Sequence, residues 1–321
     1  MVKDTFVTKL GKIGNRIIPK FFLPTIREIY NKCYYDNFYY KNYEKPLIDK
    51  IIAAHSESDN SEIQGILKFI SNNGLISQPY EWANPKTYDN KKILKSIRVY
   101  RDNDKKLMYT YLNGKRIYFP ASWDKRQIKR YFFSVQLVEQ HPQSPHHYLD
   151  SGFDVDGDSI VVDCGVAEGN FGLSVVEKCK TLYLFEPDEI WMEPLRATFA
   201  PWEDKVVIVQ KYLSNVSDEN NISLDEYFSD KPYPNFLKLD VEGYEESILL
   251  GSKNILKSGE TNKVAICVYH KADDESRLGN ILKDSGFTLK VNQGYCLLSV
   301  DKIYPYIRHC VMQAEKSTTQ N

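Results

Sequence analysis

The sequence predicts an α/β protein whose core is a doubly wound, mostly parallel sheet. Three observations lead to this fold class. From residue 159 onward, short apolar segments alternate with amphipathic ones; a loop with three glycines follows the first apolar segment; and an acidic residue follows the second. Short segments rich in β-branched and aromatic residues are typical of strands buried on both faces. We therefore expect a Rossmann-like sheet of seven strands that ends in an antiparallel hairpin.

The strands and helices of this sheet are expected to alternate along the chain. Strands are expected at 159–163, 181–185, 205–210, 235–240 and 263–269, with the closing hairpin formed by 287–291 and 295–300 around Asn292-Gln293-Gly294. Helices are expected between them, at 170–180, 190–199, 244–256 and 275–286. In such a sheet, ligands bind at the carboxyl ends of the strands.

Two regions are expected to precede the ligand-binding domain, which we assign to residues 153–314. Residues 1–92 are expected to be mostly helical, and Ser61 with Gln64 three residues later predicts a capping box. Residues 93–152 are expected to form a β-hairpin around Asn113-Gly114, followed by a helix. The segment HPQSPHHYLD, with its two prolines, then leads into the sheet.

Composition and charge narrow the range of partners. The 321 residues include 42 Lys+Arg and 43 Asp+Glu, a formal charge of −1, so no strong field favours nucleic acid. A basic stretch at residues 91–130 could form an RNA-binding face, but no RNA-binding signature accompanies it, and we predict no nucleic-acid partner. The six cysteines show no C-x-x-C spacing, which argues against a zinc site and a disulfide scaffold.

The beginning of the chain bears on where the protein acts. No apolar run is long enough to cross a bilayer, and the first residues lack the pattern of a secretory signal, so we expect a cytoplasmic protein. Residues 1–20 carry a net side-chain charge of +4 with apolar residues between the basic ones. Such a segment could lie on the inner face of an anionic membrane, although a helix packed on the domain would explain it equally well.

The glycine-rich loop predicts a binding site for a cationic cofactor. It reads DCGVAEG, and Ala167 stands where the dinucleotide fingerprint G-x-G-x-x-G needs its second glycine. Asp163 and Glu168 would disfavour a phosphate, whereas both suit S-adenosylmethionine, which carries a sulfonium, an ammonium and no phosphate. Glu186 lies 23 residues after Asp163, where an acid in doubly wound folds binds ribose hydroxyls. The alternative is that the glycines only form a tight turn.

The candidate cofactor-binding residues follow from this loop, the second strand end and the fourth strand end. They are Asp163, Gly165, Val166, Glu168, Gly169, Asn170, Glu186, Pro187 and Asp240.

The candidate catalytic residues are Asp240, Glu242 and His270. Asp240 and Glu242 end the fourth strand, where the reacting end of the ligand is expected, and His270 ends the fifth. A histidine there can take the proton of a hydroxyl at neutral pH, and a solvent-exposed or supporting histidine is an equally good interpretation. The neighbouring Glu245 and Glu246 fit a helix N-terminus, where acids complement the dipole. The three residues could also hold Mg²⁺, but nothing in their spacing requires a metal, and none is predicted.

A family resemblance rests on these motifs together. KLDVEGYE, following DCGVAEGNFG and LFEPD and followed by VYHK, resembles the FkbM family of S-adenosylmethionine-dependent methyltransferases. The hairpin and EQHPQSPHHYLD are also similar to the region before the catalytic domain in its bacterial polysaccharide-locus members. The similarity covers roughly residues 95–300.

The resemblance implies a class I methyltransferase fold and methyl transfer to a hydroxyl. The implied acceptor is a sugar of a surface glycan or of its lipid-linked precursor. It implies that Asp163, Gly165, Gly169 and Glu186 hold the cofactor, and that Asp240 with Glu242 lies at the reacting end.

Two other classes stay open at this point. The chain could be a binding module that keeps the cleft without chemistry, or a nicotinamide-dependent oxidoreductase, which Ala167 and Glu168 disfavour. The segment from Glu139 to Tyr148, with His141, His146 and His147, could form part of the acceptor wall, and a plain connector between domains is a slightly better interpretation of it.

Overall fold

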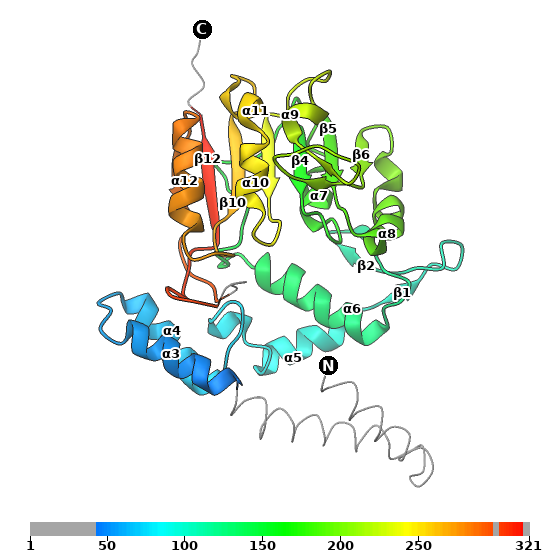
Figure 1. Cartoon of the computed structure of the whole chain (residues 1–321). Helices are drawn as coiled ribbons and strands as arrows, with labels where there is room; N and C mark the ends of the chain where they lie inside the picture. The colour runs from blue at the N-terminus through cyan, green and yellow to red at the C-terminus, as the bar shows by residue number, and fades with distance from the viewer. Residues whose placement is uncertain (1–42, 298–301, 317–321) are drawn as a thin grey trace. The chain divides into compact units, whose positions relative to one another are not determined.

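The computed structural model describes residues 43–297 and 302–316 (Figure 1). The predicted membrane-binding segment at residues 1–20 therefore lies outside the described residues. The chain forms two compact units that divide between Leu75 and Ile76. No helix in the described part of the chain is both long and apolar enough to cross a bilayer.

The first unit contains two packed helices, α3 (Lys45–His55) and α4 (Ser61–Asn73). The predicted capping box is wrong by one residue: Asn60 is the N-cap of α4, and its Oδ1 accepts from the backbone N–H groups of Glu62 and Ile63. The Gln64 side chain instead donates to the carbonyl of Ser58 in the preceding loop. Asparagine is one of the best N-cap residues, so it takes this position ahead of Ser61.

The second unit begins with the predicted hairpin and helix. Its elements before the large sheet are η2 (Glu81–Ala83), α5 (Tyr88–Ser96), β1 (Tyr100–Arg101), β2 (Met108–Leu112), β3 (Lys115–Phe119), α6 (Lys125–Phe132) and the π-helical turn η3 (Phe133–Glu139). Strands β2 and β3 pair antiparallel, with Leu112 opposite Lys115, so Asn113-Gly114 forms the two-residue loop. Asp124 and Gln127 form a capping box at the start of α6.

The rest of this unit confirms the doubly wound sheet. Its strands are β4 (Ile160–Cys164), β5 (Thr181–Phe185), β6 (Val206–Val209), β9 (Phe236–Leu239), β10 (Lys263–Cys267), β11 (Thr288–Val291) and β12 (Val311–Glu315). They lie in the order β11-β12-β10-β9-β4-β5-β6, and β12 alone runs antiparallel to its neighbours. The strand order reverses between β4 and β9, and a crevice for ligands forms at such a switch point.

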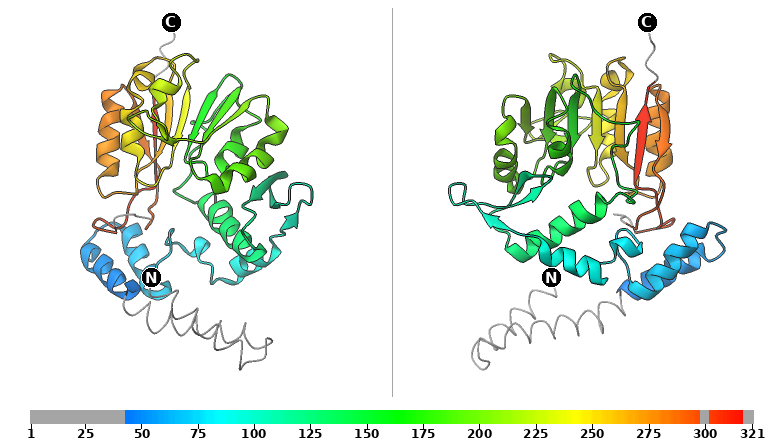
Figure 2. Two further views of the ribbon diagram at one scale, coloured as in Figure 1. Left: turned by 45° about the vertical axis from the view of Figure 1, so that its right-hand side comes forward. Right: turned by 180° about the vertical axis from the view of Figure 1, so that it is seen from behind.

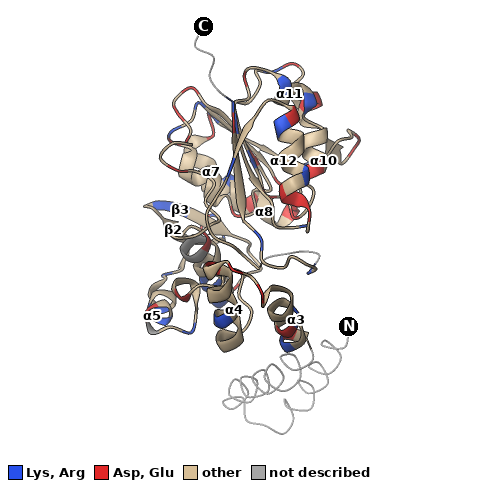
Figure 3. Ribbon diagram, turned by 90° about the vertical axis from the view of Figure 1, so that its left-hand side faces the viewer, with Lys and Arg blue, Asp and Glu red and all other residues tan. Residues whose placement is uncertain are grey.

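Helices cover both faces of the sheet (Figure 2). The helices and short elements among the strands are α7 (Asn170–Val175), α8 (Glu189–Phe199), η4 (Ala200–Trp202), β7 (Tyr212–Leu213), β8 (Asn221–Ile222), α9 (Leu224–Tyr227), α10 (Glu245–Leu250), α11 (Lys253–Lys257) and α12 (Asp274–Asp284). Side chains of α7 and α8 pack into one core cluster and those of α9 to α12 into another. Figure 3 shows α7 on one side of the sheet and α10 to α12 on the other.

Two predicted elements need correction. The closing hairpin uses β12 (Val311–Glu315) in place of the predicted partner at 295–300. Within that partner, Cys296 forms only an isolated bridge with Arg308, and residues 298–300 lie outside the described residues. Both segments after β11 are apolar, and their sequence alone does not say which one enters the sheet. The helix predicted at 244–256 is two helices, α10 and α11, which Gly251 and Ser252 separate.

Candidate active site

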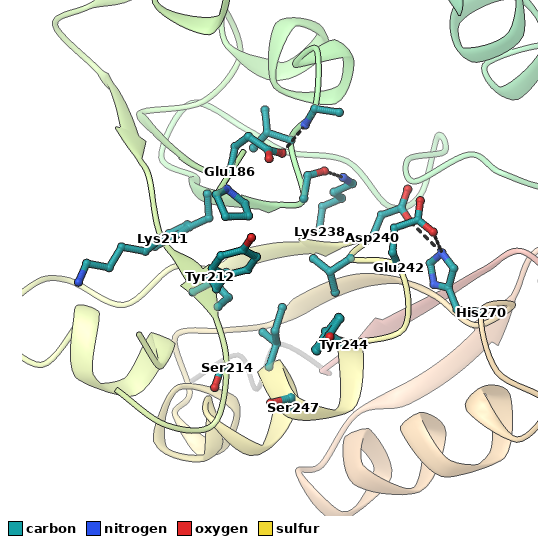
Figure 4. A pocket seen from close by; sticks show the side chains of 18 of the residues that line it. Glu186, Lys211, Tyr212, Ser214, Lys238, Asp240, Glu242, Tyr244, Ser247 and His270 are labelled. Atoms are coloured by element: carbon teal, nitrogen blue, oxygen red, sulfur yellow. Dashed lines mark hydrogen bonds and ion pairs between the residues drawn. The ribbon is translucent and has the colours of Figure 1, made fainter. Parts of the chain in front are cut away.

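A cavity of about 990 Å³ opens at the carboxyl ends of the parallel strands (Figure 4). Its walls come from the loops that follow β4, β5, β6, β9 and β10, and from residues before the sheet. The cavity thus includes the switch point between β4 and β9. Its volume is at the upper end of the range for small-molecule sites, about 300–1,000 Å³, so it has room for a cofactor and part of an acceptor.

The glycine loop is folded tightly against the neighbouring strand end. Gly165 has a φ of 76°, and a Cβ at this position would lie 1.9 Å from the carbonyl oxygen of Asp240. Only glycine allows both that conformation and that close approach. Gly169 is in the left-handed region and is the N-cap residue of α7. At Gly165 the loop therefore presents its backbone to the cavity, while Val166, Glu168 and Asn170 of the same loop also line the wall.

A buried ion pair supports the loop from behind. Lys238 on β9 and Asp163 on β4 are 5% and 1% exposed, and Lys238 Nζ lies 3.0 Å from Asp163 Oδ1. Lys238 also donates to the carbonyl of Gly165, at 2.7 Å. Burial opposes its charge, but Asp163 and Asp240 outweigh this and raise the pKa of Lys238. Asp163 itself is not part of the cavity wall, so its contribution is to fix the loop through Lys238.

Glu186 connects the second strand end to the glycine loop. Its Oε2 accepts from the backbone N–H of Ala167 and its Oε1 from that of Asp188, both at 2.9 Å. Burial raises the pKa of this carboxyl, although the two amides act in the opposite direction. The side chain is thus held in one orientation at the cavity wall, where its remaining lone pairs can accept from a ligand.

His270, Asp240 and Glu242 meet at the far end of the cavity. His270 is 1% exposed, and its Nδ1 lies 2.8 Å from Oε1 of Glu245, which is equally buried. Its Nε2 lies 3.6 Å from both Asp240 Oδ1 and Glu242 Oε2 (Figure 4). Burial lowers the pKa of His270, but Glu245, Asp240 and Glu242 outweigh it and raise that pKa overall.

Asp240 is held by tyrosines from two parts of the chain. Tyr148 donates to its Oδ2 at 2.7 Å, and Tyr269 donates to its Oδ1 at 3.4 Å. Burial acts against its charge, yet Lys238 and the histidines nearby hold the pKa of Asp240 well below its usual range. This carboxylate stays ionised at neutral pH.

The segment from Glu139 to Tyr148 contributes to the cavity and is more than a connector. Glu139 and Tyr148 line the wall, and His146 lies behind them with its Nε2 3.2 Å from the hydroxyl of Tyr269. Burial lowers the pKa of His146 to about 4, so this ring is neutral. His141 instead stacks on Trp82.

Carboxylates outnumber ammonium groups in the cavity wall. Five carboxylates and two lysines line it: Glu139, Glu168, Glu186, Asp240, Glu242, Lys211 and Lys238. Burial raises the pKa of Glu139 well above its usual range and that of Glu168 to about 6. A ligand with positive charge would offset the burial that opposes ionisation of these carboxyl groups, and Lys238 is already paired with Asp163.

Most of the residues expected from the sequence lie in this wall. They are Gly165, Val166, Glu168, Asn170, Glu186, Pro187, Asp240, Glu242 and His270, whereas Asp163 and Gly169 lie outside it. The wall also contains residues not expected from the sequence: Tyr131, Lys211, Tyr212, Leu213, Ser214, Lys238 and Tyr244. The segment from Lys211 to Ser214 could have been found, because it follows the predicted third strand at its carboxyl end.

Solved structures of methyltransferases are similar to this chain at low identity. One, FkbM from Methylobacillus flagellatus KT, is 17% identical with a TM-score of 0.44; the match covers 58% of this chain and 52% of that one, about half its length. Another, the N-methyltransferase NodS from Bradyrhizobium japonicum WM9 with S-adenosyl-L-homocysteine, is 13% identical over 58% of this chain and 88% of that one, with a TM-score of 0.39. No family profile matches the chain, and no curated protein matches its sequence. We therefore infer the function from the geometry and charge of the cavity.

Proposed function

We propose that this chain is an S-adenosylmethionine-dependent O-methyltransferase. The observation that carries the proposal is the excess of carboxylates around a glycine loop at the switch point of a doubly wound sheet. S-adenosylmethionine has a sulfonium and an ammonium, so these carboxylates lower its energy, whereas a nucleotide phosphate would be repelled.

The residues of the cavity suggest how the cofactor is held. Glu186, oriented by the backbone amides of Ala167 and Asp188, is placed to accept from ribose hydroxyls. Glu168 and Asp240 lie on the two sides of the switch point and favour the positive groups of the ligand. When bound, the cofactor supplies an electrophilic methyl group on its sulfur.

The cluster of Asp240, Glu242 and His270 is proposed as the reacting end. Its carboxylates and imidazole can hold an acceptor hydroxyl and receive its proton. Holding the acceptor oxygen in line with the methyl group supplies much of the rate in such a displacement.

We further propose that the acceptor is a sugar hydroxyl of a glycan or of its lipid-linked precursor. Tyr244 supports this choice: it lines the cavity two residues after Glu242, and its ring is 69% exposed. An exposed tyrosine ring with a polar tip suits an acceptor that has both apolar faces and hydroxyls. Contact of residues 1–20 with an anionic membrane stays a prediction, which liposome flotation of the full chain and of a form without these residues tests.

Calorimetric titration tests the cofactor assignment. We expect the full chain to bind S-adenosylmethionine and S-adenosylhomocysteine saturably, and NADH not at all. Glu186→Ala should weaken this binding at least tenfold, whereas Glu193→Ala on the exposed side of α8 should not change it. If neither adenosyl compound binds, the methyltransferase assignment is wrong and a binding module without this chemistry becomes the better interpretation.

A further inference from the structure

Neither ring nitrogen of His270 makes a hydrogen bond of normal geometry among the described residues, but Nδ1 has the Glu245 carboxylate 2.8 Å away, whereas Nε2 has no group as close. His270 Nε2 is buried, faces the two carboxylates of Asp240 and Glu242, and has no hydrogen-bond partner among the described residues. Both carboxylate oxygens are 3.6 Å away, which is too long for a hydrogen bond. Leaving a buried nitrogen without a partner costs free energy, so a ligand between these three groups would stabilise the site.

We propose that Asp240, Glu242 and His270 bind a divalent metal ion. Ligand atoms about 2.1 Å from a common ion lie roughly 3.0–3.4 Å apart at octahedral or tetrahedral angles. The distances from His270 Nε2 to Asp240 Oδ1 and to Glu242 Oε2, both 3.6 Å, are close to this range. Among the described residues, the ligand atoms within 4.8 Å of one another here belong to Asp240, Glu245 and His270, so the Glu242 carboxylate has to move for it to meet Asp240 and His270 at one ion. Glu242, whose side chain is 83% exposed, can move toward the ion from the solvent side.

Glu245 supports this site without binding the ion. It lies beside His270 Nδ1 at 2.8 Å and accepts from the backbone N–H of Val241 at 3.0 Å, so it fixes both the ring and the strand end. A carboxylate on the far nitrogen of a ligating histidine is the usual support of such ligands, because it orients the ring and increases its basicity. From the sequence alone, Glu245 fits only a role at a helix N-terminus, where it complements the dipole.

The ligand set indicates the class of ion. Two carboxylate oxygens with one imidazole nitrogen suit a divalent transition ion such as Mn²⁺ better than Mg²⁺, which prefers oxygen alone.

The role of the ion, though not its binding, rests on the proposed function. An ion at this position binds the acceptor oxygen and lowers the pKa of its hydroxyl. The hydroxyl proton passes to the Glu242 carboxylate oxygen that does not bind the ion, and then to water; His270, whose Nε2 binds the ion, does not take it. An oxygen lone pair forms the bond to the methyl carbon, and the electrons of the carbon–sulfur bond remain on sulfur, which leaves S-adenosylhomocysteine.

Titration of the chelator-treated full chain with Mn²⁺, followed by electron paramagnetic resonance, tests the site directly. We expect one saturable Mn²⁺ per chain. Glu242→Gln, at an exposed side chain that folding does not require, should weaken binding at least tenfold, and Glu245→Gln should weaken it about 10–100-fold. Glu246→Gln is the matched control: it is the next residue on α10, pairs with Arg277 and should leave the affinity unchanged.

Two results would overturn the metal site: no saturable Mn²⁺ binding up to millimolar concentration, or binding that Glu242→Gln and Asp240→Asn both leave unchanged. A parallel titration with S-adenosylmethionine separates the two proposals. Cofactor binding without Mn²⁺ binding refutes the metal site alone, and Mn²⁺ binding without cofactor binding refutes the proposed function alone.

Discussion

Replacing Lys238 by methionine tests whether the buried ion pair holds the glycine loop. The substitution keeps most of the side-chain volume but leaves Asp163, 1% exposed, without a counter-charge. Removing one partner of a buried pair costs about 3–5 kcal/mol. For a domain of this size each kcal/mol lowers Tm by about 2–4 °C, so we expect a decrease of roughly 6–20 °C.

The assay is thermal and urea unfolding, both followed by circular dichroism, with Lys211→Met as the control. Lys211 also lines the cavity, but its ammonium donates to backbone carbonyls, at 2.8 Å to that of Glu219, in an exposed loop. Its substitution should cost less than about 1 kcal/mol. The double variant Asp163→Asn with Lys238→Met should recover at least half of the lost unfolding free energy, because Asp163 no longer carries a buried charge without a partner and Asp240 keeps its hydrogen bonds to Tyr148 and Tyr269. An unfolding free energy of Lys238→Met within about 1 kcal/mol of that of the natural chain would refute the reasoning.

Three further predictions concern single residues of the cavity. Glu168 has a pKa of about 6 in the folded chain, above its unfolded value, so its contribution to stability is present below about pH 4.5 and is lost as pH rises through 6. Between pH 4.5 and pH 7, the unfolding free energy measured in urea should therefore fall by about 2 kcal/mol more for the natural chain than for Glu168→Gln. Tyr148→Phe removes the hydrogen bond to ionised Asp240 while keeping the ring, and should lower the unfolding free energy by about 1.5–3 kcal/mol. An unchanged unfolding free energy would show that this hydrogen bond does not stabilise the fold. Gly165→Ala forces a Cβ onto the carbonyl of Asp240 and should abolish binding of S-adenosylmethionine in calorimetry, and normal affinity would show that the loop can move aside.

The sequence determined the features that depend on neighbours along the chain. The alternation of strands and helices, the hairpin at Asn113-Gly114 and the glycine loop were all predicted and are confirmed, because each depends on a local pattern of side chains or backbone freedom. The acids at strand ends were found for the same reason: parallel strands bring their carboxyl ends to one edge of the sheet.

The tertiary structure alone decided the partners of these residues. Tyr148 reaches Asp240 across 92 positions, and Lys238 reaches Gly165 across 73, and no local pattern encodes such pairs. Glu245 satisfied a local rule for helix N-termini, yet in the fold it holds His270. Likewise, the structure alone shows that β12 pairs with both β10 and β11. Burial and charge pairing depend on the whole fold, and they set the pKa values and the unpartnered nitrogen on which the chemistry of the cavity depends.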